Sequence, residues 1–364
     1  MVVNMKRNKK PKIALIGAYP PPYGGVSIHI QRLKNKLEKK NVECFVYSFS
    51  ENNYENIKNV KSITNPKKWI LKYLFTSNED IIHSHISDWR LRIIISLMSL
   101  IGKKSIISIH GENLKTSLKG NYFKKMLIKI SLKLSSAVVP VNTDIKDLCL
   151  SIGVKPGKIE VISPFIPPSI KDNEIKEIPQ KIWNFINNHS PIISANAYKI
   201  TFFNNQDLYG LDLCVNLCAD LKKDYPNIGF VFSLPDIGDY TYFNKIKSII
   251  IEKNIEKNFI FITEPYQFYP ILMKSDIFVR PTNTDGDSVS IREALYLGVP
   301  VIGSDVISRP EGTIIFRNRN IDDFIKICKE VISNYDFYKN MVKSMELKEN
   351  DEKILKLYYK IYNE

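Results

Sequence analysis

Cysteines, long apolar runs and glycine-rich nucleotide motifs are all scarce in this chain of 364 residues. The five cysteines are odd in number and scattered through apolar stretches, so we interpret them as reduced core residues and not as disulfides or zinc ligands. The longest apolar stretch, residues 93–101, has about half the length of a membrane span. The apolar run at residues 13–18 is too short for a signal-peptide core. The sequence therefore predicts a cytoplasmic protein without a transmembrane segment.

Acidic residues are scarce in the first half of the chain only. Residues 1–168 contain 28 Lys and Arg against 11 Asp and Glu, whereas residues 169–364 contain 24 against 27. The first half therefore carries a charge of +17 and the second a charge of −3, which add up to the total of +14. A basic half indicates an anionic partner, which is nucleic acid, an acidic membrane surface or a phosphorylated substrate. The alternative interpretation is that the lysines of this half serve only to keep the chain soluble and bind no anionic partner.

A predicted amphipathic helix at residues 122–135 carries a stripe of lysines and fits an anionic membrane surface. An ordinary solvated helix is the other interpretation of this pattern. The basic half contains no recognisable DNA- or RNA-binding module, so no nucleic-acid partner is expected.

Short apolar strands alternate with amphipathic helices along most of the chain. This alternation predicts the α/β class, with two Rossmann-like parallel-sheet domains that face each other across a cleft. A proline-rich segment at residues 163–168, where the charge also changes sign, predicts the boundary. The first domain would span residues 1–168 and the second 169–350, and a helix at residues 351–364 would pack back on the first domain. The strands are expected at residues 12–18, 42–49, 80–85, 105–110, 137–142 and 159–162, and then at 191–195, 229–233, 259–263, 276–280 and 301–303.

Polar residues follow the predicted strands at their carboxyl ends, where parallel sheets bind their ligands. His83 and His85 end one strand and His110 ends the next, in a chain with only five histidines. Gly24 and Gly25 lie between the first strand and a helix, where backbone N–H groups can approach a phosphate. They form neither a dinucleotide fingerprint nor a Walker loop, because no third glycine and no Gly-Lys-Ser/Thr follow.

The most informative stretch runs from residue 276 to residue 305. It predicts a buried strand that ends at Arg280, a polar loop, a helix that begins near Ser288, and a second strand after Gly298-Val299-Pro300. Within it, Asp285 and Glu293 are separated by seven residues. This pattern resembles retaining glycosyltransferases of the GT-B fold, in the large family four, where two Glu residues at that spacing grip a nucleotide sugar. Looser matches are Gly24-Gly25 with His29, the strand that ends at His85, and His110-Gly111.

The resemblance implies transfer of a sugar, with retention, from a nucleotide sugar to a saccharide acceptor. Glu293 would accept hydrogen bonds from the ribose hydroxyls, Asp285 would meet sugar hydroxyls, and His110 would contact the donor sugar. Helix-start N–H groups would hold phosphate or sugar oxygens. The residues expected in catalysis are His110, Asp285 and Glu293. The residues expected to bind the donor are Gly24, Gly25, Lys199, Arg280, Asp287, Ser288, Val289, Ser290 and Arg292. The residues expected on the acceptor side are His83 and His85.

One departure from the family concerns the leaving diphosphate. Family members carry an Arg and a Lys early in the second domain, whereas the corresponding places here read Ala195-Asn196-Ala197 and Tyr209-Gly210. A diphosphate leaving group needs positive charge or a metal. Candidates for that charge are Arg280, Lys199, Arg292 and Arg309, of which Arg280 is placed best because it ends the strand before the loop.

The Asp285-Gly286-Asp287 segment also allows a second interpretation. An Asp-x-Asp after a strand holds a divalent metal in glycosyltransferases of the other main fold. The two-sheet layout and the helix that follows favour a site without metal, so neither a metal nor a cofactor is expected.

Three function classes remain open from the sequence. The first is a glycosyltransferase that acts on a lipid-linked saccharide in cell-surface polysaccharide or glycoconjugate synthesis, peripheral on the inner face of the cell membrane. The second is a nucleotide-sugar 2-epimerase of the same fold, which needs no acceptor. The third is a non-catalytic protein that binds an anionic surface. The donor, the acceptor and the oligomeric state are not predicted.

Overall fold

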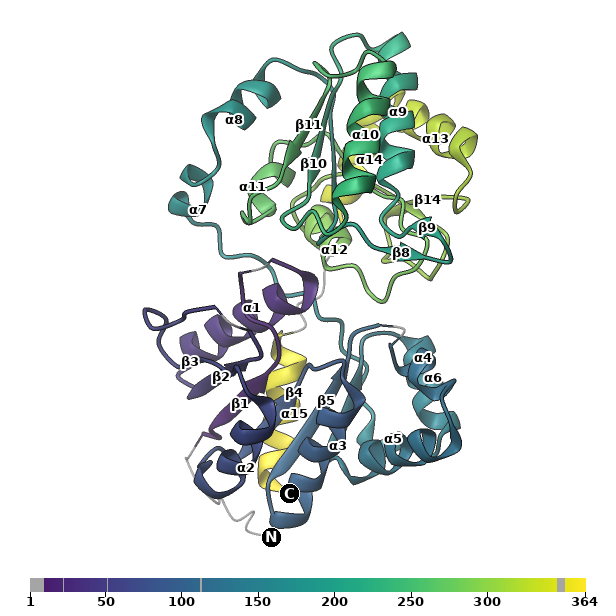
Figure 1. Ribbon diagram of the computed structural model, residues 1–364. Helices are drawn as coiled ribbons and strands as arrows, with labels where there is room; N and C mark the ends of the chain where they lie inside the picture. The colour runs from purple at the N-terminus through teal and green to yellow at the C-terminus, as the bar shows by residue number, and fades with distance from the viewer. Residues whose placement is uncertain (1–9, 22, 51, 112, 346–350) are drawn as a thin grey trace. The chain divides into compact units, whose positions relative to one another are not determined.

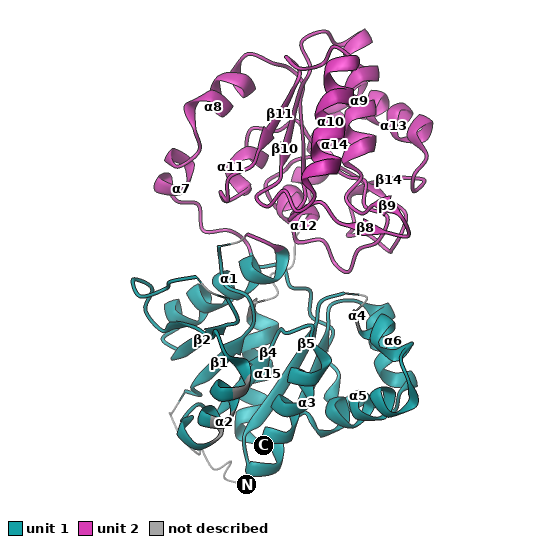
Figure 2. Cartoon of the chain, in the orientation of Figure 1, with its two compact units in different colours: residues 1–21, 25–166, 349–364 teal, residues 22–24, 167–348 magenta. Residues whose placement is uncertain are grey.

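The chain forms two compact units, which Figure 2 shows in different colours. The computed structural model describes residues 10–364 except residues 22, 51, 112 and 346–350. Unit 1 comprises residues 1–21, 25–166 and 349–364, and unit 2 comprises residues 22–24 and 167–348. The chain thus passes into unit 2 inside the proline-rich segment, close to the boundary that the sequence predicts at residue 168.

Unit 1 is built on a six-stranded sheet whose neighbouring strands are all parallel (Figure 1). The strand order β3-β2-β1-β4-β5-β6 changes direction between β1 and β4, so the carboxyl ends of these two strands flank the expected ligand position. The strands are β1 (Ile13–Ile16), β2 (Cys44–Ser48), β3 (Val60–Ser62), β4 (Ile81–Ser84), β5 (Lys104–Ile109) and β6 (Ala137–Pro140). The helices are α1 (Gly25–Lys39), α2 (Pro66–Thr76), α3 (Trp89–Leu97), η1 (Met98–Ile101), α4 (Asn113–Leu118), α5 (Tyr122–Leu134), α6 (Thr143–Ser151), η2 (Pro156–Lys158) and α15 (Asp351–Asn363).

Unit 2 repeats this plan with a second parallel sheet of six strands. Its order β11-β10-β7-β12-β13-β14 changes direction between β7 and β12. The strands are β7 (Ile192–Asn196), β10 (Gly229–Ser233), β11 (Phe259–Ile262), β12 (Ile277–Arg280), β13 (Val301–Ser304) and β14 (Thr313–Phe316), and a small antiparallel pair consists of β8 (Phe202–Phe203) and β9 (Gln206–Asp207). The helices are α7 (Asp172–Lys176), α8 (Gln180–Asn187), α9 (Leu211–Asp224), α10 (Tyr240–Glu252), α11 (Tyr269–Leu272), α12 (Val289–Tyr296), α13 (Ile321–Ser333) and α14 (Tyr335–Lys343).

The last helix, α15, belongs to unit 1 although it follows unit 2 in the chain. Its apolar face, which includes Ile354, Tyr358 and Ile361, is buried in the same core cluster as Ile13 and Ile30 of β1 and α1. This packing follows from the spacing of its apolar residues, which recur every three or four positions along one helical face.

The prediction of a strand at residues 159–162 is wrong. Only Ile159 forms a β-bridge, with Val138 of β6. Glu160 and Ile162 donate to the carbonyl oxygens of Val138 and Pro140 at 3.1 and 3.2 Å, but Pro140 has no N–H with which to return a bond. The ladder therefore cannot continue. The sequence did not predict the strands β3, β8, β9 and β14, or the helices α2, α3, α4, α6, α7, α8, α13 and α14.

Candidate functional site

The loop after β12 leads into α12 in unit 2, as the sequence predicts. Ser288 caps the helix, because its Oγ accepts a hydrogen bond from the Ile291 N–H at 3.3 Å. Gly298 follows the helix with a φ of +74°, a conformation that ends helices and that favours glycine. This capped helix places Ser288, Val289 and Ser290 at the carboxyl edge of the sheet.

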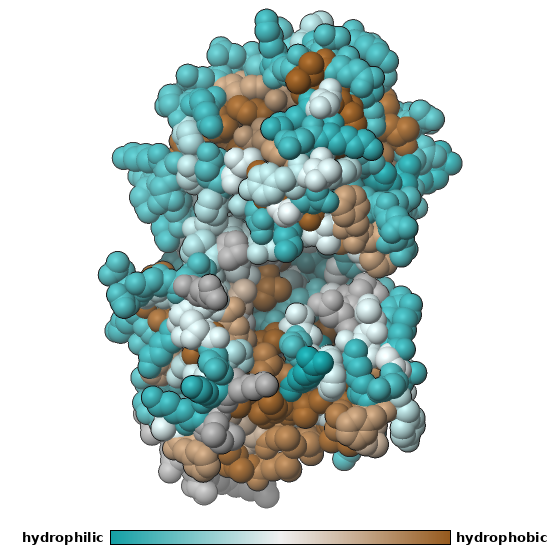
Figure 3. Space-filling view, viewed as in Figure 1, coloured by the Kyte–Doolittle hydropathy of each residue, from teal (hydrophilic) through white to brown (hydrophobic). Residues whose placement is uncertain are grey.

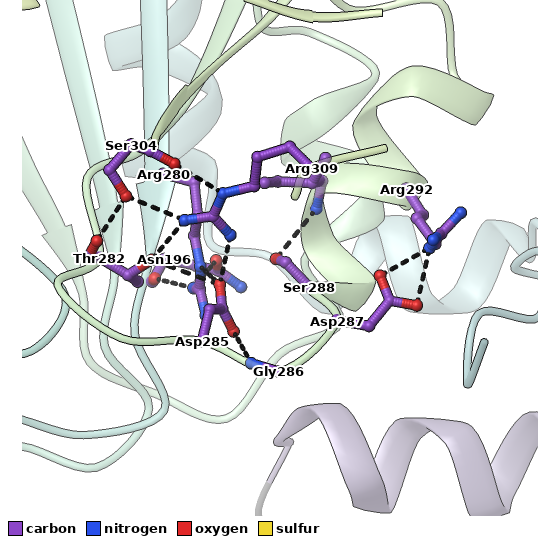
Figure 4. A network of polar contacts seen from close by, with 11 residues as sticks. Asn196, Arg280, Thr282, Asp285, Gly286, Asp287, Ser288, Arg292, Ser304 and Arg309 are labelled. Carbon is purple, nitrogen blue, oxygen red and sulfur yellow. Dashed lines mark hydrogen bonds and ion pairs between the residues drawn. The ribbon is translucent and has the colours of Figure 1, made fainter. Parts of the chain in front are cut away.

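Asp285 lies between two arginines at this edge (Figure 4). Its Oδ2 accepts from Arg309 Nη1 at 2.9 Å and from Arg280 Nε at 3.3 Å. Thr282 Oγ1 donates to the same oxygen at 3.3 Å, and the Gly286 N–H donates to Oδ1 at 3.1 Å. Both oxygens of the carboxylate are therefore engaged within the protein.

This network is buried and carries a net positive charge. The Arg309 side chain is 1% exposed, and those of Arg280 and Asp285 are 11% and 12% exposed. Burial alone would raise the pKa of the Asp285 carboxyl, but the guanidinium groups of Arg280 and Arg309 outweigh burial and hold that pKa below its usual value. Two guanidinium cations and one carboxylate anion leave a charge of one positive unit.

Arg280 reaches across the point where the strand order changes direction. Its Nη1 donates to the carbonyl oxygen and to Oδ1 of Asn196, at 2.9 and 3.1 Å, and its guanidinium lies 4.9 Å from the ring centroid of Tyr209. Asn196 in turn donates through Nδ2 to Ser290 Oγ at 2.9 Å. Arg280 therefore contacts both Asn196 and Tyr209, the two places where the resemblance leads us to expect basic residues.

A second ion pair joins Asp287 to Arg292. Arg292 Nε donates to both carboxylate oxygens of Asp287, at 2.8 and 2.9 Å, and the Arg292 side chain is 28% exposed. A metal ion bound by Asp285 and Asp287 would have to displace a guanidinium group from each carboxylate. Within the part of the chain that the structure describes, no three His, Cys, Asp or Glu residues are grouped so that they could hold a metal ion.

The remaining donor candidates of unit 2 lie in two environments. Glu293 is in the second turn of α12 and is 5% exposed. Lys199 is exposed, and its ammonium lies 5.9 Å from the ring centroid of Tyr198 and not in the network around Asp285. The sequence named Arg309 as one of four candidates for the charge on the diphosphate. Its pair with Asp285 could not be predicted, because the two residues are 24 positions apart.

His83 of unit 1 is a core residue. It is fully buried, its Nδ1 is hydrogen-bonded to Tyr358 Oη at 2.6 Å, and its Nε2 is hydrogen-bonded to Ser108 Oγ at 2.8 Å. Both ring nitrogens therefore have partners inside the fold, which leaves none for an acceptor.

His85, His110 and His29 lie together where the strand order of unit 1 changes direction. His85 Nδ1 and His110 Nε2 share a hydrogen bond of 2.8 Å, and the His29 ring lies 5.0 and 5.6 Å from these two rings. His29 donates through Nδ1 to the Pro164 carbonyl oxygen at 2.5 Å. The Nε2 atoms of His29 and His85 are buried, and the described residues offer them no hydrogen-bond partner.

These histidines are neutral at physiological pH. Burial lowers the pKa of His29 to about 4, although its bond to Pro164 acts in the opposite direction. Burial, and after it the neighbouring imidazoles, hold the pKa values of His85 and His110 well below 6.5. The pair can therefore exchange hydrogen bonds with a hydroxyl group but provides no positive charge.

A pocket of about 280 Å³ opens beside this histidine pair. Gly17 lies on its wall, and a Cβ atom at that position would come within 2.6 Å of Ile30 Cδ1 and 3.1 Å of His85 Cβ. A side chain at Gly17 would therefore crowd His85 and would force the end of the Ile30 side chain to move. Gly24 is half-buried and Gly25 begins α1.

Known proteins share the family and the fold of this chain. The family Glycosyltransferase Family 4 matches residues 23–170, and Glycosyl transferases group 1 matches residues 193–347. An uncharacterized glycosyltransferase of Methanocaldococcus jannaschii is 22% identical in an alignment of 353 positions that covers 91% of each chain. A glycosyltransferase structure from Rickettsia africae aligns with a TM-score of 0.74 at 17% identity, over 97% of this chain and 99% of that one. HepE of Anabaena in complex with UDP-glucose aligns with a TM-score of 0.69 at 12% identity, over 96% and 97%.

The two parallel six-stranded sheets match the GT-B architecture of glycosyltransferases, which confirms the predicted fold class. The chain belongs to glycosyltransferase family 4, whose members are retaining enzymes that use nucleotide-sugar donors. The cleft between the two domains stays a prediction.

Proposed function

We propose that this enzyme transfers a sugar from a nucleotide sugar bound by unit 2 to a lipid-linked saccharide, in the synthesis of a cell-surface polysaccharide or glycoconjugate. The observation that carries the donor assignment is the buried, positively charged network of Arg280, Asp285 and Arg309 beside the start of α12. A diphosphate that leaves the sugar carries charge that this network can stabilise without reorganisation. UDP-glucose, which HepE of Anabaena binds, is the first donor to test.

Within this proposal the residues of unit 2 have separate roles. Arg280 faces the diphosphate, and the helix-start N–H groups of Ser288 to Ser290 hold phosphate or sugar oxygens. Glu293 accepts hydrogen bonds from the ribose hydroxyls. Asp285 is a positioning residue that holds the two guanidinium groups in place, because its own oxygens are already engaged.

Unit 1 supplies the acceptor side in this proposal. Its pocket contains His85 and His110, whose neutral rings can exchange hydrogen bonds with a sugar hydroxyl. His110 is proposed to contact the donor sugar. His83, which has both ring nitrogens engaged in the core, serves the packing of α15 and not the acceptor.

The lipid-linked acceptor is supported by the surface of unit 1. Phe75, Leu97, Leu100 and Ile101 are 83%, 43%, 67% and 57% exposed on α2, α3 and η1. Figure 3 shows apolar surface on unit 1 in the region of these helices. Residues 61–135 contain 14 Lys and Arg against four Asp and Glu, a charge of +10. Exposed apolar side chains and lysines together suit an anionic bilayer, because the apolar side chains can insert between the lipids and the lysines are attracted to the anionic headgroups.

None of the described helices is both long enough and apolar enough to cross a bilayer. From the exposed apolar side chains and the basic charge of unit 1, we propose peripheral attachment at the cytoplasmic face of the membrane.

Flotation with vesicles tests the membrane proposal. Changing Lys124, Lys125, Lys129 and Lys133 to Ala removes four positive charges at about 1 kcal/mol each and should weaken binding to anionic vesicles at least tenfold. The matched control changes four exposed lysines of unit 2, namely Lys245, Lys247, Lys253 and Lys257. Equal binding by both quadruple variants would refute the assignment.

An assay with labelled donors tests the reaction. Product is expected only when donor and lipid-linked acceptor are both present. Conversion of the donor sugar without acceptor would instead indicate epimerisation. Complete loss of transfer in EDTA, with recovery on addition of Mn²⁺ or Mg²⁺, would contradict the site without metal.

A further inference from the structure

Arg92 is a buried cation that the sequence does not single out. It lies in the first turn of α3 and is 5% exposed. Its Nε donates to the carbonyl oxygen of Ile86 at 2.6 Å, and no ion pair is described for it in residues 10–345 or 351–364 outside the gaps at 22, 51 and 112. The nearby Asp88 caps α3 through the Arg90 N–H at 2.7 Å. The charge of Asp88 acts on Arg92 and opposes the fall in its pKa, but no direct ion pair neutralises the guanidinium. A buried charge without a direct ion pair is costly to the fold, so its placement points to a ligand.

The Arg92 side chain lines the pocket of about 280 Å³ at the carboxyl ends of β1 and β4. The same wall carries Ser87, His85 and His110, and Phe49 and Ile86 supply apolar surface. This volume is just below the range for ligand pockets, which begins at roughly 300 Å³. The pocket can therefore hold a group about as large as one sugar or one phosphate ester.

Arg92 sets the charge of this pocket. None of the described residues that line it is acidic, and burial keeps His85 and His110 neutral. Burial also lowers the pKa of Arg92 to about 10, which leaves the guanidinium protonated at neutral pH. The Nε2 atom of His85 is buried and has no hydrogen-bond partner among the described residues. One cation and a neutral imidazole with an unpartnered nitrogen thus belong to residues that line the same volume.

We propose that this pocket binds an anionic group, a phosphate or a carboxylate, and that Arg92 is its principal charge partner. Only the assignment of that group to the acceptor rests on the proposed function. Under that assignment the acceptor presents its anion to unit 1, while the diphosphate of the donor is bound by the arginines of unit 2.

The five histidines of the chain allow a direct test by NMR. In protein with ¹³C-labelled histidine, titration with inorganic phosphate is expected to shift the ring signals of His85 and His110. His189 of unit 2 lies outside the pocket, so its signal is the internal reference and should not move with those of His85 and His110. Phosphate that binds only at the donor site would leave the signals of His85 and His110 unchanged. Signals of His85 and His110 that do not move up to saturating phosphate would overturn the proposal.

Substitutions on one helix provide matched variants. Arg92→Met should weaken phosphate binding at least tenfold, and Arg92→Lys should retain part of it. Arg90→Met removes an exposed cation two positions away and should bind phosphate like the wild type. Equal affinity of the Arg92→Met and Arg90→Met proteins would overturn the proposal. If Arg92→Met does not fold, the Arg92→Lys protein and the wild-type titration decide.

The ligand class is tested with glucose, glucose 6-phosphate and glucuronate. The two anions should shift the pocket signals more strongly than glucose, and whichever anion binds more tightly identifies the group. Preference for neutral glucose would overturn the proposal. If the anions bind but no nucleotide sugar supports transfer, the proposed function fails and the anion site stands.

Discussion

Arg309 and Asp285 form an ion pair of 2.9 Å in which the arginine side chain is 1% exposed. The same carboxylate oxygen accepts from Arg280 at 3.3 Å. One carboxylate cannot neutralise two guanidinium groups, so the site retains a positive charge in a place that water hardly reaches. Charge in such an environment acts more strongly on a ligand than it would in water.

Arg280→Met is expected to lower kcat/KM for the donor by about 10²-fold, because it removes one cation from the path of the leaving diphosphate. Asp285 keeps its pair with Arg309 in this variant, so the fold should persist. Steady-state kinetics with varied donor measures the effect. Arg317→Met, which removes a cation that is 71% exposed in the same unit, is the control. An Arg280→Met enzyme as active as this control would rule out the role of Arg280.

Asp285→Asn distinguishes a positioning role from direct contact with the sugar. If Asp285 acts through the arginines, the affinities for the nucleoside diphosphate and for the nucleotide sugar change by the same factor. Calorimetric titration with both ligands measures the ratio. Unchanged binding of the nucleoside diphosphate together with weaker binding of the nucleotide sugar would instead place Asp285 against the sugar.

The histidine cluster predicts that unit 1 loses stability in mild acid. The folded pKa of His29, about 4, is below its unfolded value of 6.5, so the unfolded chain binds more protons between these values. The free energy of unfolding should therefore fall as the pH drops from about 6.5 to about 4, by up to about 3 kcal/mol for His29. His83, His85 and His110 act in the same direction.

Urea unfolding at several pH values measures this dependence. His29→Gln should flatten it, whereas His189→Gln, which changes the histidine outside the cluster, should not. A dependence that is the same in the His29→Gln protein and the wild type would contradict the account.

Tyr358→Phe should lower the free energy of unfolding by about 1–3 kcal/mol. The substitution leaves the buried Nδ1 of His83 without its partner at 2.6 Å. Tyr359→Phe changes a less buried tyrosine on the same helix and is expected to have little effect. Denaturant titration compares the two proteins, and equal stability would show that the contact between α15 and β4 is unimportant.

The alternation of apolar strands and amphipathic helices was enough to predict two parallel sheets, because buried parallel strands read as continuous apolar runs. The helix start at Ser288 was also predictable, because a helix cap is an interaction between residues that are close in the sequence. Contacts between residues that are far apart in the sequence could not be predicted. His83 meets Tyr358 across 275 positions, and Arg309 meets Asp285 across helix α12 and strand β13. Arg92 resembles any arginine on an amphipathic helix until the fold buries it.

The most direct test of the donor site is a thermal-shift screen of nucleotide sugars against the wild type and Glu293→Ala. A donor at about 100 times its Kd stabilises the folded state by about 2.7 kcal/mol, which raises the Tm of a unit of this size by roughly 5–10 °C. We predict such a shift for one nucleotide sugar in the wild type and its loss in Glu293→Ala. A wild type that no nucleotide sugar stabilises, or a Glu293→Ala protein that keeps the full shift, would contradict the account.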